Sequence, residues 1–194
     1  MMMNEYQRES IKLYLAPHIP RYAEAMINSL MIPNGSQEMD IGLRKDVING
    51  LTKFLKSCRK YFKVYLPKIL ELIWHGLTTS ANLYVERVVN SVSFGDGEFY
   101  SERTDSDGDT ISFDSYIYAI IDFVTTLFDS VKYRELIKPV LTDLLYYIMF
   151  YIQITDEQVE AWQSDLERFI EDDDIDTIGY SVRVAAQDLI LNLS

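Results

Sequence analysis

Clustered carboxylates are the side chains of this sequence with the clearest capacity for chemistry. Asp105, Asp107 and Asp109 alternate with small residues, which places oxygen ligands at the first, third and fifth positions of a calcium loop of the EF-hand kind. That loop also needs a glycine at its sixth position and a bidentate glutamate at its twelfth. Thr110 and Tyr116 stand there instead. Calcium binding is therefore a remote alternative to a solvated loop or to a loop that contacts a basic partner.

The residues of most catalytic sites are scarce. The chain has two histidines, His18 and His75, and one cysteine, Cys58. A Ser-His or Cys-His pair is therefore hard to assemble, and His75, inside an apolar helical run, is interpreted as a partly buried packing residue. The sequence has no P-loop, no dinucleotide-binding glycine loop and no zinc-type spacing. We expect no enzyme activity, no cofactor and no metal.

Charge is distributed unevenly along the chain. The net charge is −12, and residues 1–100 hold 12 Lys and Arg against 10 Asp and Glu, whereas residues 101–194 hold 6 against 20. A half this acidic repels nucleic acid and anionic membranes and attracts basic partners, although it can also serve solubility alone. The richest apolar run, 144–154, is shorter than the roughly 18 residues that a membrane span needs. We expect neither direct nucleic-acid binding nor membrane insertion.

Apolar residues recur at helical spacing through most of the chain. The pattern predicts helices over about 20–32, 40–61, 67–90, 116–128, 132–152 and 180–191, joined mostly by short turns and without a competing strand pattern. Thr155 followed by Gln158 is a capping box that starts another short helix. The fold class is therefore predicted to be all-α, with antiparallel helical hairpins stacked into an α-solenoid.

Two acidic segments interrupt this pattern. Residues 93–112 are predicted to form a solvated loop, and residues 164–179 a linker held to the preceding hairpin by Trp162 and Phe169. Truncating a docked tryptophan of that kind would cost about 3–5 kcal/mol. The last segment, 180–191, combines Val182-Arg183 with Ala186 and Ile190 as the opening helix of a HEAT repeat does. Such a helix needs a neighbour on each side, so we expect the chain to be a piece of a longer array.

Several runs of the sequence together resemble a known family. The run Tyr146–Gln158, followed by Trp162, the segment 169–173 and the segment 180–189, resembles the middle of the importin-β superfamily and, within it, the importin nine branch. Upstream, Leu15-Ala16-Pro17, Ile19-Pro20, the 106–108 loop and Phe113 are similar as well. The resemblance implies that residues 1–194 form about three to four HEAT repeats of one superhelix, with helices near 62–90 and 132–152 on its inner surface.

The same resemblance implies a function. Receptors of this family carry basic cargo, such as histones and ribosomal proteins, through the nuclear pore, contact nucleoporins, and release cargo under control of the Ran GTPase while shuttling between cytoplasm and nucleus. A generic HEAT-repeat scaffold is the alternative. The candidate cargo-binding residues are the clustered acids, which are Glu98, Glu102, Asp105, Asp107, Asp109, Glu171, Asp172, Asp173, Asp174 and Asp176.

Overall fold

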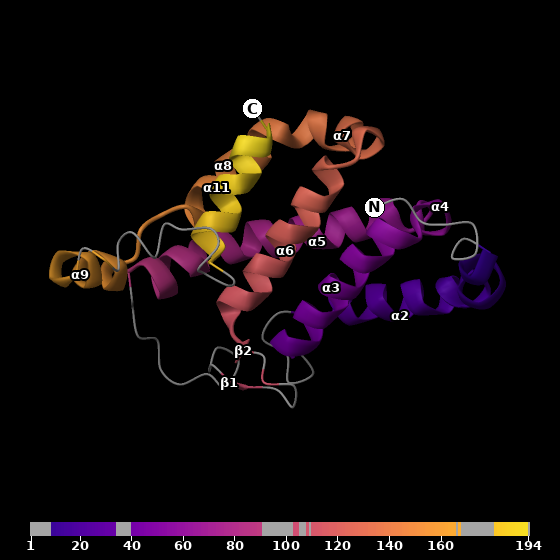
Figure 1. Ribbon diagram of the computed structural model, residues 1–194, viewed down its shortest axis with the longest axis horizontal. Coiled ribbons are helices and arrows are strands. Elements are labelled where there is room, and N and C mark those ends of the chain that lie inside the picture. The colour runs from indigo at the N-terminus through magenta and orange to yellow at the C-terminus, as the bar shows by residue number, and fades with distance from the viewer. Residues whose placement is uncertain are drawn as a thin grey trace.

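The computed structural model describes residues 9–33, 40–90, 103–104, 108, 110–165, 167 and 181–193. These residues form helices and one short hairpin (Figure 1). In chain order they are η1 (Ile11–Leu15), η2 (Ala16–His18), α2 (Ile19–Met31), α3 (Ile41–Ser57), α4 (Arg59–Phe62), α5 (Leu66–Tyr84), η3 (Val85–Val89), β1 (Arg103–Thr104), β2 (Thr110–Ile111), α6 (Phe113–Phe128), α7 (Val131–Ile137), η5 (Lys138–Val140), α8 (Leu141–Tyr151), α9 (Asp156–Ser164) and α11 (Val182–Leu193).

Local sequence accounts for where these helices begin. Asp40 caps α3 by accepting a hydrogen bond from the Leu43 N–H at 2.9 Å. Ser112 and Ser115 form a capping box at the start of α6, and Thr155 and Gln158 form the one predicted at the start of α9. Each box satisfies backbone N–H groups that the first turn of a helix leaves without partners.

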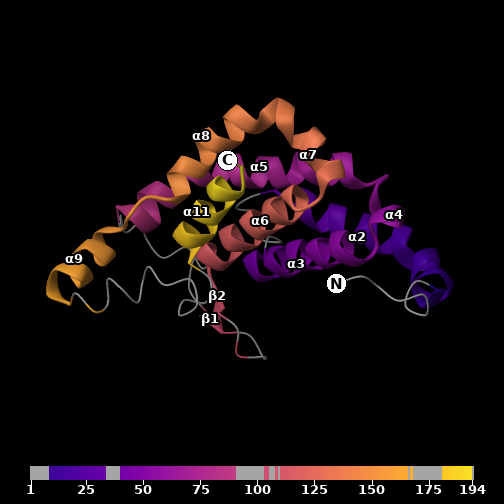
Figure 2. The same cartoon turned by 45° about the horizontal axis from the view of Figure 1, so that its top comes forward.

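The helices stack in two layers. The first layer contains α3, α6 and α11, and α6 packs between α3 and α11. The second layer contains α2, α5 and α8, and α5 packs between α2 and α8. Figures 1 and 2 show α3, α6 and α11 side by side and running in the same direction. This alternation of layers along the chain is that of a helical-repeat solenoid, and the predicted all-α fold is confirmed. The helices predicted to share an inner surface, α5 and α8, do share a layer.

A single apolar core joins the layers. Ile69 and Leu77 of α5, Ile117 and Ile120 of α6, and Ile148 of α8 are all essentially without solvent exposure. Tyr151, at the end of α8, is equally buried, and its hydroxyl donates a hydrogen bond to the Leu77 carbonyl oxygen at 2.5 Å. Because a buried phenol needs an acceptor, this bond ties α8 to α5 at one defined register.

The structure corrects three predictions about secondary structure. The helix predicted over 132–152 is divided by η5, because Pro139 lacks a backbone N–H and its ring disfavours a continuous helix. The helix predicted over 40–61 ends at Ser57 and restarts as α4. The loop 93–112, predicted without strands, contains the antiparallel pair β1–β2. Its strands of two residues each are too short to produce an alternating pattern.

Candidate functional site

The predicted cargo-binding acids lie outside the described residues. This holds for all ten of them, which are Glu98, Glu102, Asp105, Asp107, Asp109, Glu171, Asp172, Asp173, Asp174 and Asp176. Their flanking residues are described, and they show where the two acidic segments join the array. Thr104, Gly108 and Thr110 are the covalent neighbours of Asp105, Asp107 and Asp109, and Ser181 stands five positions after Asp176.

The β1–β2 hairpin is fastened to the start of α3 by an ion pair. The Arg103 guanidinium donates to the Asp40 carboxylate at 2.6 Å. Partial burial alone would raise the pKa of Asp40, but the Leu43 N–H and Arg103 lower it, and the net pKa lies below its ordinary value. The carboxylate that caps α3 is therefore also the anchor for the first strand of the hairpin.

The second strand lies against the same helix. A Cβ atom added at Gly42 would stand 2.9 Å from Cδ1 of Ile111, so only a glycine lets β2 approach the first turn of α3 this closely. The chain then passes through Ser112 directly into α6. Both ends of the hairpin are thus fixed where α3 and α6 begin.

The start of α11 lies beside the start of α6. Burial raises the pKa of Tyr84 well above its ordinary value, the negative charge of Asp114 raises it further, and Arg183 lowers it. Tyr84 therefore interacts electrostatically with charged residues in the first turns of both α6 and α11. Because α3, α6 and α11 run in the same direction, the residues that follow the two acidic segments, Ser112 and Ser181, lie along one edge of the array.

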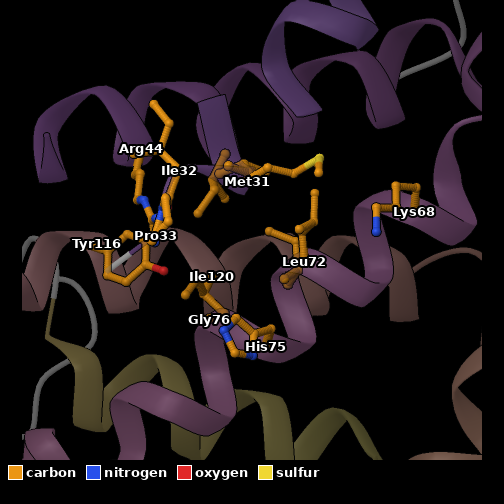
Figure 3. Close-up of a pocket in the computed structure, with 13 residues that line it drawn as sticks. Met31, Ile32, Pro33, Arg44, Lys68, Leu72, His75, Gly76, Tyr116 and Ile120 are labelled. Atoms are coloured by element: carbon orange, nitrogen blue, oxygen red, sulfur yellow. The ribbon is translucent and has the colours of Figure 1, made fainter. Parts of the chain in front are cut away.

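A cavity of about 210 Å³ opens between α2, α3, α5 and α6 (Figure 3). Arg44 is directed toward Tyr116, to which it is hydrogen-bonded, and it also donates to the Ile32 carbonyl oxygen at the end of α2. The arginine therefore joins the end of α2 to α6. His75 lines the cavity and is exposed, so its interpretation as a partly buried packing residue was wrong. Gly76 admits the Tyr116 hydroxyl, which lies 2.7 Å from the position of a Cβ there.

The described residues offer little for metal or nucleophilic chemistry. Among them, no three His, Cys, Asp or Glu side chains lie close enough to hold a metal ion. Tyr116, at the twelfth position of the calcium pattern, is buried between helices and takes no ligand position. Cys58 is buried, and burial raises the pKa of its thiol, which makes it a poor nucleophile.

An aromatic surface on α5 and α8 is a feature that sequence reasoning missed. Trp74, Tyr146, Tyr147 and Phe150 form a continuous set of ring contacts, and Tyr146 is 61% exposed. The sequence did contain a sign of this surface, because Phe150 follows Tyr146 and Tyr147 at helical spacing. Its partner Trp74 is more than seventy positions earlier, so only the tertiary structure brings the four rings together.

Comparison with known proteins defines the class to which this array is similar. No protein-family model matches the chain, and no helix in its described part is long and apolar enough to cross a membrane. Among curated proteins, the chain is similar to an importin.

One such relative is Importin-9 of Drosophila melanogaster. It is 28% identical over 192 residues, which cover 96% of this chain and 18% of the relative. The chain thus spans less than a fifth of the length of this relative. The similarity supports the predicted resemblance to importins along nearly the whole chain.

Proposed function

We propose that the chain is part of a nuclear import receptor that binds basic protein cargo, such as histones or ribosomal proteins. It works by surface complementarity and not as an enzyme, and the receptor shuttles between cytoplasm and nucleus. Ran would control cargo release, and nucleoporins would be the partners in the pore. The observation that carries this proposal is the similarity to Importin-9 over 96% of the chain.

The position of the acidic segments supports the choice of basic cargo. Asp105, Asp107 and Asp109 are covalently next to described residues of the hairpin, which is fixed to the starts of α3 and α6. Asp176 is within about 18 Å of Ser181, since a chain extends at most about 3.6 Å per residue. Both segments can therefore present carboxylates to one partner that lies along this edge, and opposite charges steer such a partner toward it.

A generic HEAT-repeat scaffold is the alternative function. It would share the two helical layers, because those follow from repeat packing alone. The similarity to an importin favours the receptor. Charge favours it as well, since 20 of the 30 acidic residues fall in the last 94 positions, a concentration that repeat packing does not require.

The rate of cargo association tests this function. Glu171, Asp172 and Asp173 are changed to Gln or Asn, and the binding of a histone dimer is measured by stopped flow at two salt concentrations. Exposed charges act mainly on encounter, so we expect the association rate and its salt dependence to fall more than the dissociation rate rises.

A matched variant controls for net charge. Glu24, Asp129 and Glu135 are exposed acids on α2, at the end of α6 and on α7, whereas the acidic segments precede the starts of α6 and α11. Neutralising these three changes the net charge by the same amount and should leave the association rate nearly unaltered. Equal effects of the two triple variants would reduce the acidic segments to solubilising surface and refute the proposal.

A further inference from the structure

Four aromatic rings form one surface on the layer that contains α5 and α8. Trp74 of α5 meets Tyr147 of α8 edge-on, with ring centroids 5.8 Å apart. Tyr146 meets both Tyr147 at 5.2 Å and Phe150 at 5.3 Å, again edge-on. These are the geometries that aromatic pairs prefer. The rings therefore hold one another in place, and the surface is formed before any partner arrives.

Tyr146 is exposed, the other three rings of this surface are half-buried, and the surface borders an apolar groove. Tyr146 is 61% exposed and Met149 is 54% exposed. Trp74 also lines a groove of about 320 Å³ with Pro67, Leu70, Leu136 and Leu144. A contiguous exposed apolar patch of this kind usually marks a contact with another protein.

Charge indicates which partner fits. Glu71 is the one charged residue lining the groove among the described residues, and it already pairs with Lys68 at 3.0 Å. Asp143 precedes Tyr146 by three positions and Tyr147 by four, so the carboxylate lies on the same face of α8 as both rings. It is exposed and takes no part in the ion pairs found in the described part of the chain. Aromatic faces beside a carboxylate attract a cation.

The chain already uses such a contact internally. The Arg183 guanidinium of α11 lies 5.5 Å from the centroid of the Trp162 ring of α9, within the distance at which a ring attracts a cation. Tyr146 has the same capacity on an exposed part of α8, and the half-buried Tyr147 lies next to it. An arginine or lysine can also lay its aliphatic stem on Trp74 and the groove.

We propose that the surface of Trp74, Tyr146, Tyr147 and Phe150, with Asp143, binds an arginine or lysine side chain of a basic protein partner. The adjoining groove takes an apolar residue that neighbours this cation in the partner. The inference rests on the proposed function, because it assigns basic cargo to this face. It adds a short-range contact on the α5–α8 layer to the long-range attraction of the acidic segments.

A fluorescence titration tests this site directly. The chain has two tryptophans, so Trp162→Phe leaves Trp74 as the reporter inside the proposed surface. The probe is a synthetic peptide of alternating arginine and leucine, at about 0.5 M salt to screen long-range attraction. We expect its binding to change Trp74 emission, and Tyr146→Ala to weaken binding by about two- to thirtyfold, the range of cation–π contacts. Tyr146→Phe should retain the affinity.

Two controls check that binding requires both this surface and a cation. Tyr22→Ala removes a tyrosine of similar exposure on α2 and should have no effect. Replacing each arginine of the peptide by uncharged, nearly isosteric citrulline should abolish binding at the surface. Equal binding of the citrulline peptide would overturn the proposal in favour of a purely apolar partner. Self-association that depends on Tyr146 would overturn it in favour of a second copy of the chain.

The two proposals fail in distinguishable ways. With a histone dimer as ligand, Tyr146→Ala should raise the dissociation rate and leave the salt dependence of association intact. If neutralising residues 171–173 slows association while Tyr146→Ala changes nothing, the aromatic site is wrong and the proposed function stands. If Tyr146→Ala matters only for the arginine peptide and no histone dimer binds, the site stands as a cation-binding surface and the proposed function is wrong.

Discussion

Single residues set how closely the helices approach one another, and Gly76 is the sharpest case. Its missing Cβ leaves room for the Tyr116 hydroxyl, 2.7 Å from where that atom would be. A Cβ at Gly50, also inside a helix, would meet only the flexible end of Met26 at 3.0 Å. Changing either glycine to alanine raises helix propensity by about 1 kcal/mol. Only the new methyl group at position 76 collides with a buried ring, that of Tyr116.

We therefore predict opposite effects for the two substitutions. Gly76→Ala should lower the free energy of unfolding by about 1–3 kcal/mol, because overpacking of a filled core outweighs the gain in propensity. Gly50→Ala should leave it unchanged or raise it by up to about 1 kcal/mol. Urea unfolding followed by circular dichroism measures both. Equal stability of the two variants would mean that α5 and α6 do not approach as described.

Buried tyrosines make stability depend on alkaline pH. Burial raises the pKa of Tyr84 and of Tyr151 well above the ordinary value near 10, and the neighbouring Asp114 and Tyr116 charges add to the respective shifts. The unfolded chain then loses these protons near pH 10 while the folded chain keeps them. Their contribution to stability is therefore complete below about pH 10 and falls as pH rises above it.

Removing one ionisable phenol checks this direction. Tyr151→Phe should lower stability at neutral pH by about 0.5–1.5 kcal/mol, through the lost hydrogen bond to Leu77. It should also make stability fall less steeply between about pH 9 and pH 11, which urea midpoints at several pH values would reveal. Tyr22→Phe, at an exposed site on α2, serves as the control. An unaltered slope in Tyr151→Phe would contradict the burial of this hydroxyl.

At the scale of elements, a cation–π contact joins α9 to the helix that follows it, α11. Sequence reasoning expected Trp162 and Phe169 to dock the linker onto the preceding hairpin. Trp162 is only half-buried, and its ring contacts Arg183 of α11; Phe169 lies outside the described residues. The contact joins positions 21 apart through a charge, so apolar periodicity gave no sign of it.

A smaller loss of stability follows for Trp162→Ala. We predict about 0.5–2 kcal/mol, the range of a cation–π contact, in place of the 3–5 kcal/mol of a buried aromatic. A double-mutant cycle with Arg183→Met should return a coupling energy of similar size. Hydrogen exchange of the α9 amides should accelerate in Trp162→Ala. A loss of more than about 3 kcal/mol would instead support a linker docked by a buried Trp162. A coupling energy of zero would contradict the contact between Trp162 and Arg183.

Sequence reasoning located some elements well and missed others for physical reasons. The Thr155–Gln158 box specified the start of α9 because capping is a local interaction. The break at Pro139 was missed because apolar spacing continues through η5. The β1–β2 hairpin was missed because it is fastened by contacts of Arg103 with Asp40 and of Ile111 with Gly42, which lie 63 and 69 positions earlier in the chain. The ring surface around Trp74 depends on tertiary contacts in the same way.

At the scale of the whole molecule, two stacked helical layers carry an unequal distribution of charge. The layers follow from amphipathic helices that bury their apolar faces only against neighbouring helices. The starts of α3, α6 and α11 then bring the residues that follow the two acidic segments to one edge. Under the proposed function, the carboxylates of these segments would attract basic proteins and repel nucleic acid, whose phosphates carry like charge.

Selectivity between partners tests this account most directly. We would measure the dissociation constants of the chain for a histone dimer and for duplex DNA by fluorescence anisotropy, from about 0.05 to 0.3 M salt, where screening lengths shorten markedly. The account predicts that the histone dimer binds, that its affinity falls steeply with salt, and that DNA does not bind at any of these concentrations. DNA binding as tight as histone binding, or no histone binding at the lowest salt, would contradict it.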